Sequence, residues 1–339
     1  MIQPKIPQPT ISFIDQYCGS YQKIFPEVRS YEAFKQIIMG ILTPSKRKSL
    51  VTLSKIIGLK NSQSLHNFLT QSPWKSEELR AQRLKIIFNW LKEEAIDIII
   101  DETGDPKKGN KTEYVARQYL GRLGKVDNGI VSVNIYGVRN GITFPLLFEV
   151  YKPKSRLKSG DKYQSKPQIA ARLVEQLVSQ GLKIRYVLAD SLYGERTWIE
   201  YGFRQSKSEL GWSDFHVTKY NDIAKWWEAI CCAFLLVSMR AISTQPSELS
   251  DLSTCQSELN SYLAEHPDWD FNQGWKSMLN NMQLLLLPLL AIKLVEPWLK
   301  VFEAPLLVSS FNTLIDLVNL CANALTGAKL NAIHQFSSA

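Results

Sequence analysis

The sequence predicts an α/β protein in which a mixed sheet of four strands, in the order 3-2-1-4, lies between helical N- and C-terminal regions. Two apolar strand-like runs each end in an aspartate, a hairpin signal lies between them, and a helical pattern leads into the second run. A helix between two strands returns the second strand parallel to an earlier one. Hydrophobic content of 45% and charged content of 21% are typical of a globular chain rather than a disordered one.

Residues 1–94 are predicted to form a helical region. Residues 31–42 and 48–57 carry apolar side chains at helical spacing, and Ser72-Pro73 is a good start for a helix running to about Leu91. A basic turn at residues 45–48 separates the first two helices. That turn fits either a helix-turn-helix-like contact with DNA or a solvated corner of a helical bundle.

Residues 95–242 are predicted to form the core, whose first strand is the near-continuous apolar run from Ile96 to Ile100. Such strands are buried inside a sheet. Asp101 ends this run, and a carboxylate there must be solvated or paired, which makes it a candidate site residue. Residues 107–125 follow with six basic residues against Glu113 alone. They fit a contact with a phosphate backbone or an ordinary solvated loop.

The next two strands, at residues 128–137 and 142–151, are joined through Asn140-Gly141, a strong hairpin signal. Residues 152–166 again carry six basic residues against one acidic residue. A helix then begins at Pro167. The run from Ile184 to Ala189 is predicted to be a buried strand that ends at Asp190 and places it beside Asp101.

A helical stripe follows Asp190. Tyr193, Arg196, Glu200 and Lys207 are spaced at i, i+3, i+7 and i+14, which puts them on one helix face. Carboxylates that bind hard cations, beside cations that bind phosphate, suit metal-dependent phosphoryl transfer. The same spacing fits an amphipathic helix with a solvated, charge-paired face. The order of the elements is that of an RNase H-like nuclease core.

With these motifs, the chain resembles an insertion-sequence transposase of the DDE superfamily, of the cut-and-paste type. One branch of that superfamily carries Tyr-(2)-Arg-(3)-Glu-(6)-Lys around its third acid, and the stripe above has this spacing. The resemblance spans about residues 30–245. The segments that carry it are Asp101 to Gly109, Val115 to Lys125, Ala189 to Gly194 and Ile199 to Trp212.

The resemblance implies a DNA transposase that cleaves and transfers DNA strands by a two-metal mechanism. Asp101, Asp190 and Glu200 would be the catalytic triad that binds Mg²⁺ or Mn²⁺. The expected DNA-binding residues are Tyr193, Arg196, Lys207, Lys107, Lys108, Lys154, Arg156 and Lys158. The partners would be the terminal repeats of the element and its target DNA, with a homodimer as a candidate assembly, in the cytoplasm and associated with the nucleoid.

One departure from the family concerns the link between the second and third acids. Only nine residues separate Asp190 from Glu200, where relatives carry a further strand and a β-rich insertion. A deletion between two similar Leu-Tyr-Gly stretches would leave this junction. The alternative function is therefore an internally deleted transposase that binds DNA but is impaired in cleavage, with no strand on the outer side of residues 184–189. Glu228 is a weaker alternative third acid.

Residues 243–339 are predicted to form a helical C-terminal region, with apolar helices over 279–308 and 311–325. The longest apolar run, 284–294, is too short to span a bilayer and contains Pro288, so no transmembrane helix is predicted. Five cysteines without metal-ligand spacing favour a reduced, cytosolic protein. A net charge of +8 favours a polyanionic partner.

Overall fold

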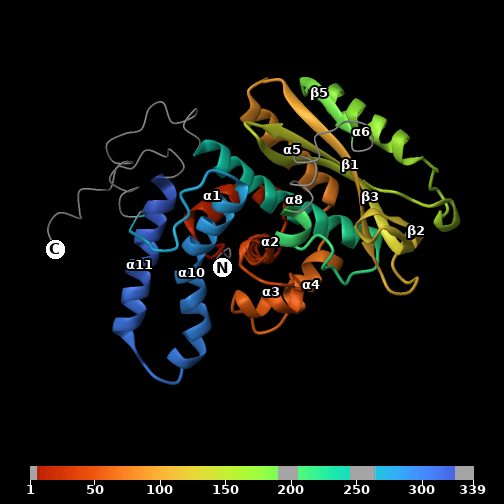
Figure 1. The fold of residues 1–339 in the computed structure, drawn as a ribbon. Coiled ribbons are helices and arrows are strands. Elements are labelled where there is room, and N and C mark those ends of the chain that lie inside the picture. The colour runs from red at the N-terminus through yellow and green to blue at the C-terminus, as the bar shows by residue number, and fades with distance from the viewer. Residues whose placement is uncertain (1–5, 190–204, 245–262, 264, 325–339) are drawn as a thin grey trace. The chain divides into compact units, whose positions relative to one another are not determined.

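The computed structural model describes residues 6–189, 205–244, 263 and 265–324 (Figure 1). The chain forms two compact units. The first combines Met1–Ser72 with Leu236–Ala339, and the second is Pro73–Leu235. The second unit holds the sheet. The sequence-based division at residues 94 and 242 stays a prediction.

The sheet of the second unit has five strands. They are β1 (Ile96–Pro106), β2 (Ala116–Leu120), β3 (Lys125–Arg139), β4 (Ile142–Val150) and β5 (Ile184–Ala189). β1 pairs antiparallel with β3 and parallel with β5, while β4 pairs with β3. The four strands expected from the sequence therefore lie in the predicted order, and the mixed α/β fold is confirmed. Asn140 and Gly141, at the β3–β4 turn, both have positive φ, as the Asn-Gly signal predicts.

The fifth strand, β2, was missed because it lies within the basic segment 107–125, which was interpreted as a loop. It pairs with the first part of β3, whereas β4 pairs with the remainder. Leu120 of β2 is buried against the backbone at Gly104 and Gly129, where an added Cβ would lie 2.7 and 2.9 Å from its methyl groups. These contacts join residues far apart in sequence, so local hydrophobic periodicity does not reveal them.

Two sequence-based expectations for the strands need correction. β1 does not end at Asp101 but continues to Pro106, because a long arm of β3 pairs with it as far as Gly129. β5 was expected to be buried, yet Tyr186 and Val187 are 64% and 49% exposed. Among the described strands β5 pairs only with β1, so it forms an edge of the sheet.

Helices cover both faces of the sheet (Figure 1). α6 (Lys166–Ser179) packs on β3 and β4 through Ile169, Leu173 and Leu177. It begins with a capping box in which Ser165 and Gln168 bind each other's backbone N–H groups. The other face packs against α5 (Ser76–Leu91) and the first part of α8 (Tyr220–Ser243).

Aromatic side chains fix α8 on its face of the sheet. Trp227 of α8 stacks on Trp212, with ring centroids 4.6 Å apart, and both indoles make T-shaped contacts with the ring of Phe148 on β4. Phe234 packs 5.8 Å from the ring of Tyr136 on β3. Such pairs add about 0.5–1.5 kcal/mol each beyond the area they bury.

The first unit is helical. It contains α1 (Ser12–Gly19), α2 (Val28–Leu42), α3 (Leu50–Ile56), α4 (Gln63–Thr70), α10 (Trp275–Leu299), α11 (Pro305–Ala324) and the last part of α8. In the predicted basic turn, Lys48 is buried and its ammonium group binds the carbonyl oxygen of Thr43. Lys46 and Arg47 remain exposed.

The described residues also contain short helical turns that are not α-helical. Single 3₁₀ turns span Gln22–Ile24, Gly121–Leu123 and Lys154–Arg156, and a π-helical turn spans Gln205–Glu209.

The apolar C-terminal helices have other bounds than the sequence indicated. The helix expected over 279–308 ends at Leu299, and α11 begins at Pro305 rather than at residue 311. α10 nevertheless continues through Pro288 and Pro297 and is 25 residues long. α8, α10 and the Pro305–Ala322 part of α11 are each long and apolar enough to cross a membrane by length and composition. The buried share of the apolar window is 83% in α8, 44% in α10 and 6% in α11. The length argument against a transmembrane helix is therefore wrong.

Candidate functional site

Asp101 lies where the parallel pairing of β1 and β5 ends. The register aligns Ile99 with Leu188 and Ile100 with Ala189. Asp101 and Asp190 are the next residues in the sequence after the Ile100–Ala189 pair, and Asp190 lies outside the described residues. The predicted parallel pairing of the two strands, β1 and β5, is therefore confirmed.

The face of the sheet around Asp101 is polar. Side chains alternate between the faces of a strand, so Asp101 shares its face of β1 with Thr103 and Asp105, both of which are buried. Asn134 of β3 lies opposite Asp101, and it donates a 3.0 Å hydrogen bond to the hydroxyl of Ser132. The Asp101 carboxylate accepts a 2.6 Å bond from the backbone N–H of Glu102.

The turn that contains Lys207 is fixed on the same face. The hydroxyl of Ser206 lies 3.0 Å from the hydroxyl of Tyr136, and the Gln205 amide oxygen accepts a 3.2 Å bond from Thr143. Burial raises the pKa of Tyr136, and the negative charge of Asp101 adds to that rise. The half-buried Lys207 is therefore held by a turn that packs close to the strand bearing Asp101.

The other residues of the predicted stripe, Tyr193, Arg196 and Glu200, lie outside the described residues. Two of the three predicted metal ligands, Asp190 and Glu200, therefore lie outside the described residues. Within the described part, no three His, Cys, Asp or Glu side chains converge as a metal site. Asp101 is thus the predicted ligand whose surroundings are known.

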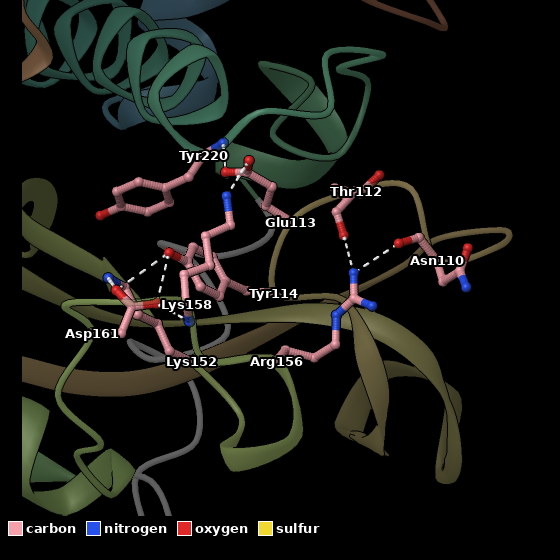
Figure 2. A network of polar contacts seen from close by, with 9 residues as sticks. All are labelled: Asn110, Thr112, Glu113, Tyr114, Lys152, Arg156, Lys158, Asp161 and Tyr220. Atoms are coloured by element: carbon pink, nitrogen blue, oxygen red, sulfur yellow. Dashed lines mark hydrogen bonds and ion pairs between the residues drawn. The ribbon is translucent and has the colours of Figure 1, made fainter.

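The two basic segments pack against each other through a polar network centred on Asp161 (Figure 2). The Asp161 carboxylate binds the ammonium group of Lys152 at 2.5 Å and the hydroxyl of Tyr114 at 3.1 Å. It also accepts the backbone N–H of Lys158 at 2.8 Å. The hydrogen bond from Lys152 is the main cause that lowers the pKa of Asp161. The sole acid of the second segment therefore organises the segment internally and ties it to the first.

Glu113, the sole acid of the first segment, connects the network to α8 (Figure 2). One oxygen pairs with the ammonium group of Lys158, and the other accepts the backbone N–H of Tyr220 at 2.8 Å. Arg156 donates a 2.7 Å bond to the carbonyl oxygen of Asn110. Although partial burial opposes it, the Lys158 and Tyr220 bonds lower the pKa of Glu113. Lys158 and Arg156 therefore position loops within the protein.

The remaining predicted DNA-binding lysines differ in exposure. The ammonium group of Lys107 lies 3.1 Å from the carbonyl oxygen of Ser213 and 3.4 Å from the ring centroid of Phe215. Lys108 is exposed, and Lys154 is exposed with its ammonium group 4.7 Å from the ring of Tyr163.

The basic segments also present exposed cations that the sequence did not single out. These are Lys111, Arg117 and Lys162. The sequence gives the net charge of a segment but does not show which cation has an acidic partner. In the structure these three side chains are exposed, whereas Lys107 is half-buried and Lys158 is paired with Glu113.

Glu228, the weaker candidate for a third acid, is completely buried between two arginines. One carboxylate oxygen accepts a 2.6 Å bond from Arg80, and the other accepts bonds of 3.1 and 2.9 Å from Arg83. Burial alone would lower the pKa of Arg83, and the Glu228 charge more than reverses this. Glu228 thus joins α8 to α5, and both of its oxygens already have charged partners.

The mixed α/β fold agrees with the comparisons. A family model described as DDE superfamily endonuclease matches residues 21–211, and the chain belongs to this family. It is an insertion-sequence transposase of the DDE type. It is 41% identical over 328 residues to a probable transposase for insertion sequence element IS701 from Microchaete diplosiphon. That match covers 66% of this chain and 86% of the relative. No solved structure matches.

Proposed function

We propose that this chain cleaves and joins DNA strands at the ends of its insertion sequence, using Asp101, Asp190 and Glu200 to hold Mg²⁺ or Mn²⁺. The register that aligns Ile100 with Ala189 carries the proposal, because Asp101 and Asp190 are the next residues in the sequence after this pair. Carboxylate oxygens are the ligands that these hard cations prefer. The ions would activate a water or 3′-hydroxyl nucleophile and stabilise the leaving oxygen.

Basic side chains would hold the DNA. Arg196 and Lys207 would bind phosphates near the reacting bond, and Tyr193 would contact the flanking nucleotide. Lys108 and Lys154, together with the exposed cations described above, would contact the phosphate backbone further away. Lys107, Arg156 and Lys158 would keep the loops that carry those cations in place. The partners are the terminal repeats and target DNA, bound by a homodimer acting on the nucleoid in the cytoplasm.

The test of the metal site is a nicking assay with Mg²⁺ or Mn²⁺ on DNA that carries the ends of the element. Any nicking by the unmodified chain should fall at least about 100-fold in Asp101→Asn, since loss of a group that acts in the transition state costs that much or more. Glu200→Gln should behave in the same way.

A matched control for that test is Asp97→Asn. Asp97 lies on the same face of β1, four residues earlier, and pairs with Arg185 at 2.8 Å. Its replacement should leave nicking unchanged. Asp101 would be rejected as a metal ligand by either of two results. The first is a folded Asp101→Asn variant that still nicks DNA, and the second is an equal loss of nicking in Asp97→Asn.

DNA binding has its own prediction. Replacing Lys108 and Lys154 together with Ala should weaken DNA binding and make the slope of log affinity against log salt less steep by roughly 0.9 for each phosphate that is no longer neutralised. Fluorescence anisotropy over a range of salt concentrations measures both quantities. Lys23→Ala with Lys85→Ala removes two exposed lysines outside the basic segments and should change neither. An equal effect in both double variants would mean that only net charge matters.

A second candidate function is an internally deleted transposase that binds DNA and cleaves it weakly. The match to the relative extends over 328 residues, yet 66% of 339 residues is about 224. Roughly a hundred positions of the relative therefore have no counterpart in this chain. The short link between Asp190 and Glu200 is where the sequence supports such a gap, and the exposed edge strand β5 leads into that link. Salt-dependent DNA binding with little Mg²⁺-dependent nicking is the result expected for this candidate.

A further inference from the structure

An exposed apolar surface covers the tip of the α10–α11 hairpin in the first unit. We call it the hairpin tip. It consists of Leu294, Trp298, Val301, Phe302, Leu306 and Leu307. These side chains are between 44% and 81% exposed, and the rings of Trp298 and Phe302 stack with centroids 6.3 Å apart. The tip lies beyond residue 211, where the family match ends.

The pattern of α10 indicates that this surface is built to pack against another helix. The buried residues of α10 all lie between Trp275 and Leu290, inside the first unit. The apolar sequence nevertheless continues to the end of the helix. Leu287, Leu294 and Trp298 of α10 are separated by seven and four residues, and all three are exposed. This spacing makes one stripe along the helix and is typical of a helix–helix seam.

The size of the hairpin tip suits a stable interface. At roughly 150 Å² for a large side chain, the six residues expose on the order of 600 Å² of apolar surface. This is at the upper end of the largest apolar patch on a typical monomer, which is about 300–600 Å². Each partner of a standard protein–protein interface contributes about 800 Å². The six side chains alone would supply most of that area, and polar neighbours would supply the rim.

The charges around the tip decide what covers it. Between residues 284 and 315 the charged residues are Lys293, Glu296, Lys300 and Glu303, two of each sign. Glu296 pairs with Lys300 at 3.1 Å. A lipid surface or DNA would select an excess of positive charge. A balanced rim is instead self-complementary when the same surface meets itself across a two-fold axis, as in most homodimers.

We propose that the hairpin tip is the interface with a second copy of this chain. Trp298 and Phe302 would be its central anchors, because buried aromatic residues dominate the energy of such interfaces. This inference specifies the contact surface of the homodimer that is part of the proposed function. It is tested without DNA or metal, so its failure and a failure of the cleavage proposal are distinguishable.

The experiment compares the mass of the full chain in solution with that of Trp298→Ser/Phe302→Ser, by sedimentation equilibrium over a range of concentrations. The unmodified chain should be a dimer, and the double variant should raise the dimer Kd at least about 100-fold. Phe271→Ser/Val51→Ser is the matched control. It removes two apolar side chains of the first unit that are 66% and 55% exposed, and it should stay dimeric. Circular dichroism and thermal unfolding confirm that each variant is folded.

Three results would overturn the proposal. The unmodified chain could be a monomer at tens of micromolar. The double variant could dimerise as tightly as the control does. Finally, a monomeric chain could float with vesicles of phosphatidylcholine and phosphatidylglycerol in a manner that depends on Trp298 and Phe302, which would make a lipid surface the occupant.

Discussion

Replacing Glu228 with Ala is expected to lower the free energy of unfolding by about 3–5 kcal/mol, because it leaves buried positive charge without its partner. The Arg83 side chain is fully buried and donates two hydrogen bonds to Glu228. Arg83 also donates a 2.6 Å hydrogen bond to the carbonyl oxygen of Pro145, but this oxygen has no formal charge and cannot balance the positive charge of the guanidinium group. Urea unfolding followed by tryptophan fluorescence measures the loss, since Trp227 lies one residue before Glu228.

Two further variants make this prediction specific. Glu228→Gln keeps the size of the side chain and one hydrogen-bond acceptor, so its loss should be smaller. Glu78→Ala removes an exposed acid from α5 and should change stability by about 0.5 kcal/mol or less. A cost below about 1 kcal/mol for Glu228→Ala would mean that the buried pair contributes little. If Glu228→Gln instead abolished nicking in a stable protein, Glu228 would be the third acid after all.

The strand order of the core could be predicted because its signals are local. Ile96 to Ile100 is a continuous apolar run, and Asn140-Gly141 fixes the tight turn through positive φ at both residues. The length of β1 and the presence of β2 could not be predicted in this way. Both depend on β3, which extends far enough to pair with β1 up to Pro106 and with β2 at its other edge. Pairing partners of this kind are not encoded in the periodicity of either segment alone.

The same distinction between local signals and distant contacts applies to the candidate site. Asp101 was expected at a strand end and Lys207 on a helical stripe. The structure places Asp101 within β1, and it places Lys207 in a π-helical turn that packs on the same face of the sheet. The roles of the basic residues could not be separated from sequence, because they depend on distant partners. Lys158 meets Glu113 across 45 residues, and Lys107 meets Ser213 across 106. The resemblance supplied the family, whereas these contacts come only from the folded chain.

Lengthening the link between the second and third acids is expected to increase Mg²⁺-dependent nicking at least about 100-fold. In the proposed chimera, the residues that separate the second acid from the third-acid helix in the Microchaete diplosiphon relative are inserted between Ser191 and Leu192, so that Tyr193 and Arg196 are kept. A catalytic group misplaced by about 1 Å can cost 100-fold in rate. Glu200 would begin its helix too soon after Asp190 in the short chain, whereas the longer segment lets the helix return to the sheet. DNA binding should change little, since the basic segments are intact.

The same chimera should also change the behaviour of β5. Tyr186 and Val187 are exposed on an edge strand, and exposed apolar edges promote association between chains. A restored strand beside β5 would cover that edge, so binding of a hydrophobic dye and aggregation on heating should both decrease. A chimera carrying Asp101→Asn controls for contaminating nucleases, and a Gly/Ser linker of equal length controls for length alone. If the unmodified chain already nicks as fast as the chimera, the triad assembles across nine residues and the exposed edge of β5 has no bearing on cleavage.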